Sequence, residues 1–106
     1  MKEKARQMVH EIRERYGLTS PSVLSVMLQI PRHKFVDKKY QDVAYADGPV
    51  PIGYDQTMSQ PYTVAFMTDL LELKKNDKVL EVGTGSGYQA AVLSSLAGKV
   101  YTIEII

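Results

Sequence analysis

The fold of this chain is decided by one stretch, which reads Val79-Leu80-Glu81-Val82-Gly83-Thr84-Gly85-Ser86-Gly87-Tyr88. Residues 78–82 are mostly apolar and β-branched at two positions, which predicts an interior strand of a parallel sheet. Glycines follow at every second position, and residues 88–97 then show the apolar spacing of a helix. Residues 100–106 have the pattern of a second strand. The stretch therefore predicts a β-turn-α-β unit, with room for a ligand at the glycine turn, where backbone N–H groups can approach it closely.

The spacing of the glycines narrows the class of ligand. A phosphate-binding P-loop requires Gly-Lys-Ser/Thr after its glycines, and Tyr88-Gln89 stands at that place. A dinucleotide-binding turn requires G-x-G-x-x-G/A. Counted from Gly83, its third small residue falls at Tyr88, and counted from Gly85 it falls at Ala90, which is a weak match. The pattern that is present, E-x-G-x-G-x-G, resembles the first motif of class I S-adenosylmethionine-dependent methyltransferases.

Two acidic residues flank the glycines. Glu104 ends the second predicted strand, 21 residues after Gly83. In nucleotide-binding β-α-β units, an acidic residue about 20 residues after the glycine turn contacts the ribose of the ligand. Its carboxylate can accept a hydrogen bond from each of the two ribose hydroxyls. The alternative for Glu104 is an ordinary acid at the end of a strand. Glu81 lies within the first predicted strand, so we expect it to be buried and to form hydrogen bonds near the turn.

Composition excludes several classes of protein. The chain has 106 residues, 44% of them apolar, which suits one small domain with a core. A net charge of +1 gives no electrostatic argument for nucleic acid or membrane as a partner. The absence of cysteine excludes disulfides and thiolate metal sites. No apolar run approaches the roughly 20 residues of a membrane span, and the charged N-terminus has no signal-peptide core. We expect a cytoplasmic protein.

Helical patterns dominate the first part of the chain. Residues 2–16 predict an amphipathic helix followed by Gly17 as its C-terminal cap, and Ser20-Pro21 predicts the start of a second helix that ends before Pro31. Residues 31–36 predict a single helical turn, and residues 40–60 an irregular loop. A third helix is expected from residue 61 to about residue 73. Its inner face is expected to be formed by Val64, Ala65, Thr68, Leu71 and Leu73.

The sequence stops within a predicted strand, at Ile103-Glu104-Ile105-Ile106. A parallel sheet of two strands cannot bury both of its faces. We therefore expect the chain to be the N-terminal part of a larger protein, a single partial domain over residues 1–106. Within it, residues 1–60 are expected to supply N-terminal helices and a substrate loop, and residues 61–106 to begin the cofactor-binding core. The exposed strand edge is expected to let the chain self-associate.

A closer resemblance covers essentially the whole chain. The segments that carry it read Pro31-Arg32-His33-Lys34-Phe35-Val36, Ala44-Tyr45, Pro51-Ile52-Gly53-Tyr54-Asp55-Gln56-Thr57-Met58-Ser59-Gln60-Pro61-Tyr62 and Ala65-Phe66-Met67-Thr68-Asp69-Leu70-Leu71. With the glycine motif and Tyr101-Thr102-Ile103-Glu104, they resemble the protein-L-isoaspartate O-methyltransferases. The glycine turn is shared with other methyltransferases, whereas the segment around Ser59 is specific to this family. The chain departs from the family at Asp55, usually glycine, and at Met58, usually isoleucine.

The resemblance implies a class I methyltransferase fold, which is a doubly wound Rossmann-like α/β sheet with extra N-terminal helices. This chain would hold those helices and the first β-α-β unit of the sheet. It also implies that the methyl group of S-adenosylmethionine passes to the abnormal carboxylate of L-isoaspartyl residues in damaged proteins, which begins their repair. The family's active-site serine falls on Ser59, and its substrate loop includes Thr57 and Gln60. Its cofactor contacts fall on Gly83, Gly85, Gly87 and Glu104.

This chemistry needs few special groups, and the sequence shows no obvious nucleophile, acid–base pair or metal cluster. A carboxylate is ionised near neutral pH and can attack a sulfonium methyl directly, so the protein mainly has to align the reacting atoms. Ser59 is then expected to position the acceptor or the cofactor, and its alternative is to cap the helix that begins at Pro61. Two other functions remain open: a class I methyltransferase with another acceptor, and a truncated module without catalysis. The near-neutral charge disfavours nucleic acid as that acceptor.

Overall fold

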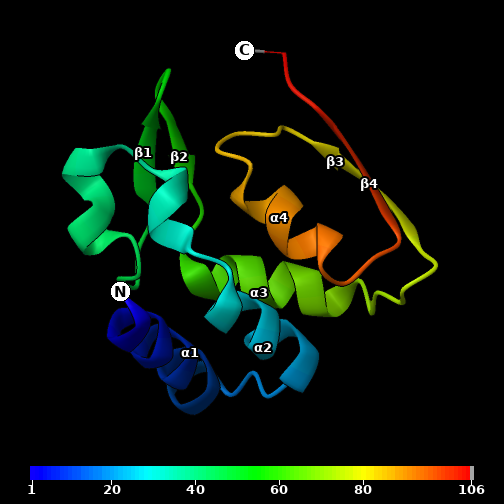
Figure 1. The fold of residues 1–106 in the computed structure, drawn as a ribbon, viewed down its shortest axis with the longest axis horizontal. Coiled ribbons are helices and arrows are strands. Elements are labelled where there is room, and N and C mark those ends of the chain that lie inside the picture. Colours follow the sequence, from blue (N-terminus) through cyan, green and yellow to red (C-terminus); the bar gives the residue numbers. More distant parts are fainter. Residues whose placement is uncertain (106) are drawn as a thin grey trace.

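The computed structural model describes residues 1–105, in which helices α1 to α3 gather on one side of two separate strand pairs (Figure 1). The α-helices are α1 (Lys2–Tyr16), α2 (Pro21–Gln29), α3 (Pro61–Leu70) and α4 (Tyr88–Ser94). Two short 3-10 helices are η1 (Arg32–Phe35) and η2 (Lys38–Val43), and the strands are β1 (Val50–Gly53), β2 (Gln56–Met58), β3 (Lys78–Val82) and β4 (Lys99–Ile103). Within the described chain, no helix combines the length and the hydropathy needed to cross a membrane.

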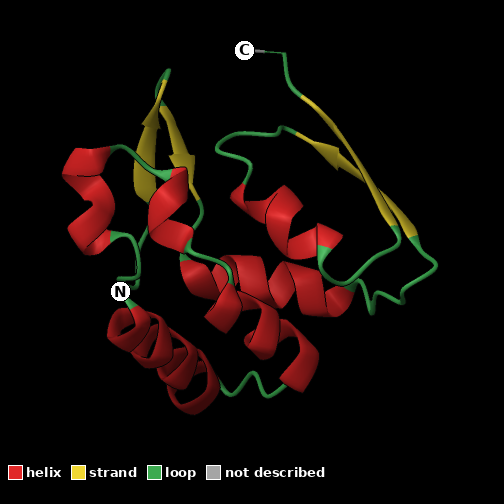
Figure 2. Cartoon of the chain, viewed as in Figure 1, coloured by secondary structure: helices red, strands yellow, loops and turns green. Residues whose placement is uncertain are grey.

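The predicted β-turn-α-β unit is present as β3, α4 and β4. Strands β3 and β4 run parallel, with Val79 beside Val100 and Val82 beside Ile103. Helix α4 joins them and lies on the side of the pair that faces the rest of the molecule (Figure 2). The helix predicted over residues 88–97 and the strand predicted over residues 100–106 both end earlier in the structure. The helix ends at Ser94, and strand β4 ends at Ile103, so that Glu104 lies just beyond it.

Two serines explain the early end of α4. The hydroxyls of Ser94 and Ser95 both donate hydrogen bonds to the carbonyl of Ala91, at 2.9 and 3.1 Å. Such bonds compete with continued helical hydrogen bonding. The backbone N–H of Ser95 accordingly bonds three residues back, to Val92, in the tighter geometry of a helix end. Ile106, the last residue of the predicted strand, lies outside the described residues.

One face of the β3–β4 pair is more exposed than the other, as expected for two parallel strands that cannot bury both faces. Val79, Glu81 and Val100 on the α4 side are half-buried. On the other face, Leu80 is 63% exposed, Val82 77% and Ile103 51%. These apolar side chains therefore remain largely open to solvent.

The N-terminal helices form most of the core. Helix α1 buries Ala5, Met8, Val9 and Ile12, as its periodicity predicts. Gly17 caps it in the left-handed region, at φ 74°, and its N–H bonds the carbonyl of Arg13. Ser20 occupies the predicted cap position of α2, but its hydroxyl lies 3.4 Å from that of Ser22 and bonds no helix N–H.

Helix α3 is shorter than predicted. It ends at Leu70, because Glu72 adopts a left-handed backbone conformation at φ 48° that cannot continue the helix. Its inner face buries Val64, Ala65 and Thr68, as predicted. The expected contribution of Leu71 is wrong, since that side chain is 52% exposed, and Leu73 lies beyond the helix.

The predicted irregular loop contains η2 and a β-hairpin. Strands β1 and β2 are antiparallel, with Val50 beside Met58 and Pro51 beside Thr57. Tyr54 and Asp55 connect them with positive φ angles of 55° and 56°, as a type I′ hairpin turn requires. Neither residue is glycine or asparagine, so the usual sequence signal of this turn is missing, and the hairpin was not predicted.

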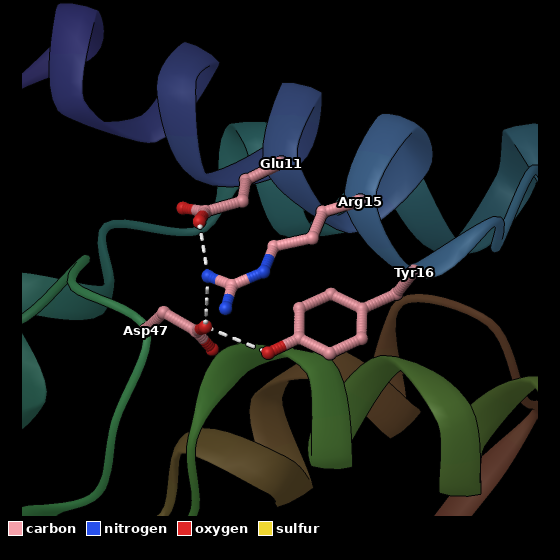
Figure 3. A network of polar contacts seen from close by, with 4 residues as sticks. All are labelled: Glu11, Arg15, Tyr16 and Asp47. Atoms are coloured by element: carbon pink, nitrogen blue, oxygen red, sulfur yellow. Dashed lines mark hydrogen bonds and ion pairs between the residues drawn. The ribbon is translucent and has the colours of Figure 1, made fainter.

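A polar network ties the segment before the hairpin to α1 (Figure 3). Arg15 donates to both Glu11 and Asp47 at 3.1 Å, and the first of these contacts joins residues one helical turn apart in α1. The hydroxyl of Tyr16 donates to the same oxygen of Asp47, Oδ2, at 2.6 Å. The Tyr16 ring also stacks on Tyr62 of α3, with centroids 4.2 Å apart. The Asp47 carboxylate therefore links α1 to the segment before the hairpin, and the Tyr16 ring links α1 to α3.

Candidate functional site

The glycine turn (residues 83–87) is bound to the end of the neighbouring strand. The backbone N–H groups of Gly83 and Thr84 both donate to the carbonyl of Ile103, at 2.8 and 3.2 Å. Gly83 lies in the left-handed region at φ 91°, and a Cβ built on it would meet nothing within 4 Å. The turn is thus held rigidly at its base, with open space above Gly83.

Glu104 lies against this turn. Its Oε1 accepts a hydrogen bond from the N–H of Gly85 at 2.7 Å, and its Oε2 accepts one from the N–H of Ile105 at 3.1 Å. The parallel register brings the two together, because β3 and β4 end side by side and the turn and Glu104 follow at once. The structure therefore places the predicted acid beside the predicted glycines.

Glu81 is half-buried, and its hydrogen bonds follow a short chain of hydroxyls. Thr102 donates to Glu81 at 2.7 Å. The hydroxyl of Thr102 has one proton, so in its 2.6 Å contact with Thr84 the Thr84 hydroxyl is the donor. These hydrogen bonds between side chains link β3, β4 and the glycine turn. Glu81 is thus less buried than expected, forms the expected hydrogen bonds near the turn, and also lines the cavity between α3, α4 and β3.

Two cavities meet at the glycine turn. The first, called here the hairpin cavity, has a volume of about 510 Å³ and lies between the turn with Glu104, the η1 segment and the β1–β2 hairpin. The second, the helix cavity, has about 440 Å³ and lies between α3, α4 and β3. Gly83, Gly85, Ser86 and Thr57 line both. Thr57 thus stands opposite the glycines where the two spaces join.

The predicted site residues divide between these spaces. Glu104 lines the hairpin cavity, and Ser59 lines the helix cavity. Gln60 and Gly87 line neither. Gln60 is the cap residue of α3, with its carbonyl accepting from Val64, and a Cβ on Gly87 would lie 4.0 Å from the Phe35 ring.

The Ser59 side chain is exposed and unused by the local fold. Its hydroxyl makes no hydrogen bond within residues 1–105, and the cap position of α3 is occupied by Gln60. The alternative role of Ser59, as a side-chain cap for α3, is therefore wrong. The hydroxyl is available to a ligand in the helix cavity.

Sequence analysis missed the group that holds Ser59 in place. Arg32 is fully buried, and its Nη2 donates to the carbonyl of Ser59 at 2.8 Å. Its guanidinium lies over the ring of Tyr88, 4.8 Å from the centroid. Burial lowers the pKa of Arg32 and raises that of Tyr88, while the attraction between the two groups opposes both shifts. No local pattern in the sequence indicates that Arg32 is buried.

The arrangement fits a nucleoside-type ligand. The hairpin cavity lies within the size range of small-molecule sites, and apolar Phe35 and Ile52 line it together with the backbone of the turn. Glu104 supplies the hydrogen-bond acceptor that ribose hydroxyls need. Gly83 has no side chain to fill the space.

Comparisons with known proteins agree with this geometry. The model of the family "Protein-L-isoaspartate(D-aspartate) O-methyltransferase (PCMT)" matches residues 3–106. The protein-L-isoaspartate O-methyltransferase of Dictyoglomus turgidum is 54% identical over 101 residues, which are 95% of this chain and 46% of that protein. That of Trichlorobacter lovleyi is 56% identical over the same shares. The chain thus spans about half the length of the curated relatives it matches.

Solved structures show the same fold. A protein-L-isoaspartate O-methyltransferase superposes with a TM-score of 0.83 at 32% identity, over all of this chain and 34% of that one. A Plasmodium falciparum structure in complex with S-adenosyl-L-homocysteine has a TM-score of 0.77 at 23% identity, over 96% of this chain and 49% of that one. The α/β class with N-terminal helices and a first β-α-β unit is therefore confirmed. The chain belongs to the protein-L-isoaspartate(D-aspartate) O-methyltransferase family.

Proposed function

We propose that this chain supplies the cofactor turn and the acceptor loop of an enzyme that transfers a methyl group from S-adenosylmethionine to the carboxylate of L-isoaspartyl residues. The observation that carries the proposal is the meeting of two predicted sets of residues. Glu104, the glycine turn and Thr57 line the hairpin cavity, and Ser59 lines the adjoining helix cavity, which shares Thr57 and the glycines. Family membership favours this acceptor over a small molecule.

S-adenosylmethionine, when bound, supplies a methyl group on a sulfonium centre. The residues of this chain have to orient the partners, because an ionised carboxylate needs no further activation. Glu104 would accept hydrogen bonds from the ribose, and the turn would pass beneath the amino-acid part of the cofactor. Ser59 and Thr57 would direct the acceptor carboxylate toward the glycines by hydrogen bonds. Gln60 would fix the backbone of this loop at the start of α3.

The chain alone is expected to bind the cofactor weakly, because residues 1–105 leave both cavities open on one side. Calorimetric titration with S-adenosylmethionine tests this expectation, and micromolar affinity of the chain would contradict it. A chimera with the remaining part of the Dictyoglomus turgidum relative joined after Ile106 tests the function. It should methylate an isoaspartyl peptide and leave the aspartyl twin unmodified.

The chimera experiment separates the alternatives. Transfer of radiolabelled methyl to the isoaspartyl peptide alone supports the proposal. Transfer to neither peptide, with S-adenosylmethionine still bound, indicates another acceptor. Failure to bind the cofactor in the chimera indicates a module that has kept the fold without the activity.

We further propose that the isolated chain self-associates through the open face and free edge of the β3–β4 pair. Leu80, Val82, Tyr101 and Ile103 lie on this face and are 49% to 77% exposed. Contiguous apolar surface on a two-stranded sheet favours pairing with a second copy. Sedimentation velocity should show dimers or larger species, and a clean monomer at all concentrations would contradict the proposal.

A further inference from the structure

Arg32 is a buried charge that has no counter-ion among residues 1–105. Its side chain is 0% exposed, and no carboxylate among the described residues forms an ion pair with it. Removing a charge from water costs several kcal/mol unless other contacts offset the loss. An apolar side chain of similar volume would often stabilise such a site equally well. A role beyond packing is therefore worth seeking in what the guanidinium contacts.

The guanidinium contacts three separate parts of the chain. Nε donates to the carbonyl of Ala44 at 2.5 Å, at the end of η2, and Nη2 donates to the carbonyl of Ser59 at 2.8 Å, at the end of the hairpin. The plane of the group lies over Tyr88, the first residue of α4, directly after the glycine turn. Nη1 of Arg32 and the hydroxyl of Tyr88 are buried too, and neither makes an aligned hydrogen bond with a described residue.

These contacts join the two sets of residues of the proposed site. Ser59 belongs to the acceptor loop, and Tyr88 follows the glycines that face the cofactor. The fork of donors in a guanidinium is rigid and planar, so it can bridge two carbonyls and stack on a ring at the same time. A lysine ammonium can satisfy one carbonyl and cannot stack in this way.

We propose that Arg32 is a positioning residue that sets the place of Ser59 relative to the glycine turn. The inference rests on the proposed roles of Ser59 and the turn. Arg32 does not reach the reacting atoms, because it is enclosed by Ala44, the Ser59 backbone and Tyr88. It acts through the backbone of Ser59, and the ring of Tyr88 transmits the position of α4 to the guanidinium.

Amide hydrogen exchange of the 106-residue chain tests the proposal without requiring activity. Arg32→Met removes the donors and keeps a long apolar side chain, whereas Arg32→Lys keeps the charge. Exchange in residues 56–64 should rise about tenfold in Arg32→Met, because the hydrogen bond from a charged donor to the Ser59 carbonyl is lost. Arg32→Lys should give a smaller rise in the same segment. Arg6→Met, on the exposed face of α1, is the matched control. It should leave the exchange of residues 56–64 unchanged.

The reference segment is α1, residues 5–12, which packs in the core away from Arg32. A rise that is equal in both segments would show only general destabilisation and would overturn the proposal, as would no rise at all. If Arg32→Met does not fold, Arg32→Lys decides: exchange like that of the unaltered chain overturns the proposal, and a rise confined to residues 56–64 supports it.

A second measurement detects the coupling itself. In the unaltered chain, saturating S-adenosyl-L-homocysteine should protect the amides of the glycine turn and also those of residues 56–64. In Arg32→Lys it should protect the turn alone. Equal protection of both segments in the variant would overturn the proposal. If the unaltered chain binds the ligand too weakly for saturation, the same comparison is made in the chimera. Failure of the chimera to bind the ligand would contradict the proposed cofactor role, and the exchange comparison above still decides the role of Arg32.

Discussion

At the scale of single residues, the glycine turn depends on a backbone conformation that few side chains tolerate. Gly83 has φ 91°, and the space where its Cβ would lie is empty. A side chain there would meet no atom of the protein, so the cost of adding one is conformational. Gly83 therefore affects both the stability of the chain and the space available for a ligand.

Gly83→Ala should lower the free energy of unfolding by roughly 1–2 kcal/mol, because alanine is strained in the left-handed region. Gly48→Ala is the matched control, since Gly48 has no positive φ and a Cβ there also meets nothing within 4 Å. It should be nearly neutral. Urea unfolding of both variants measures the difference, and equal losses would show that the strain argument is wrong.

Glu104 is the residue on which the cofactor proposal depends most directly. Glu104→Gln removes the charge and one acceptor, and hydrogen bonds to charged groups contribute about 1.5–3 kcal/mol. The affinity of the chimera for S-adenosyl-L-homocysteine should fall at least about tenfold. Calorimetry measures the dissociation constant. Glu14→Gln, exposed on α1, is the control, and an unchanged affinity in Glu104→Gln would exclude the ribose role.

At the scale of elements, Asp47 fastens α1 to the segment that leads into the hairpin. The hydrogen bond from Tyr16 to Asp47 is the main cause that raises the pKa of Tyr16 above its usual value of 10.0, with burial next. The folded state thus favours the protonated phenol. Its contribution to stability is complete below pH 10 and is lost as the pH rises through the raised pKa.

Tyr16→Phe keeps the stacked ring and removes this hydroxyl. The melting temperature of the variant should lie below that of the unaltered chain near neutral pH, and the gap should narrow as the pH rises above 10. Thermal melts followed by circular dichroism from neutral to alkaline pH provide the comparison. Tyr54→Phe removes a hydroxyl from a side chain that is 82% exposed, and it should show no gap at any pH. A gap that stays constant above pH 10 would contradict the assignment.

At the scale of the whole molecule, the helices enclose the core, whereas the outer face of the β3–β4 pair is open to solvent. Residues of α1, α2, α3, the hairpin and α4 form one continuous core. The outer face of β3 and β4 lies outside that core and is apolar. The association of the chain with copies of itself is therefore expected to depend on the sheet and not on the helices.

Val82→Glu places a charge on the open face at the end of β3, where the side chain is 77% exposed. Charge on an exposed strand opposes edge pairing, so the variant should shift toward the monomer with little change in melting temperature. Val43→Glu, at a residue of η2 that is 51% exposed, is the matched control and should associate like the unaltered chain. Sedimentation velocity at several concentrations distinguishes the two. Undiminished association of Val82→Glu would place the interface elsewhere.

Local patterns predicted the elements well where their signal lies within about a dozen residues. The periodicity of α1, the Pro starts of α2 and α3, and the strand-glycine-helix order of β3 and α4 are all confirmed. Boundaries were missed where one residue overrides the pattern, as Glu72 does after α3 and as the serines do at the end of α4. The hairpin was missed because Tyr54 and Asp55 adopt positive φ without the glycine that normally marks it.

The sequence by itself determined the β-turn-α-β unit, the absence of a P-loop, and the resemblance that led to Ser59 and Glu104, because glycine chemistry and motif spacing are local. Only the tertiary structure decided that Glu104 bonds the N–H of Gly85, that Thr57 faces the glycines, and that Arg32 is buried between Ser59 and Tyr88. Such contacts join residues many positions apart. Burial of a side chain depends on which elements pack around it, and no pattern of neighbours along the chain contains that information.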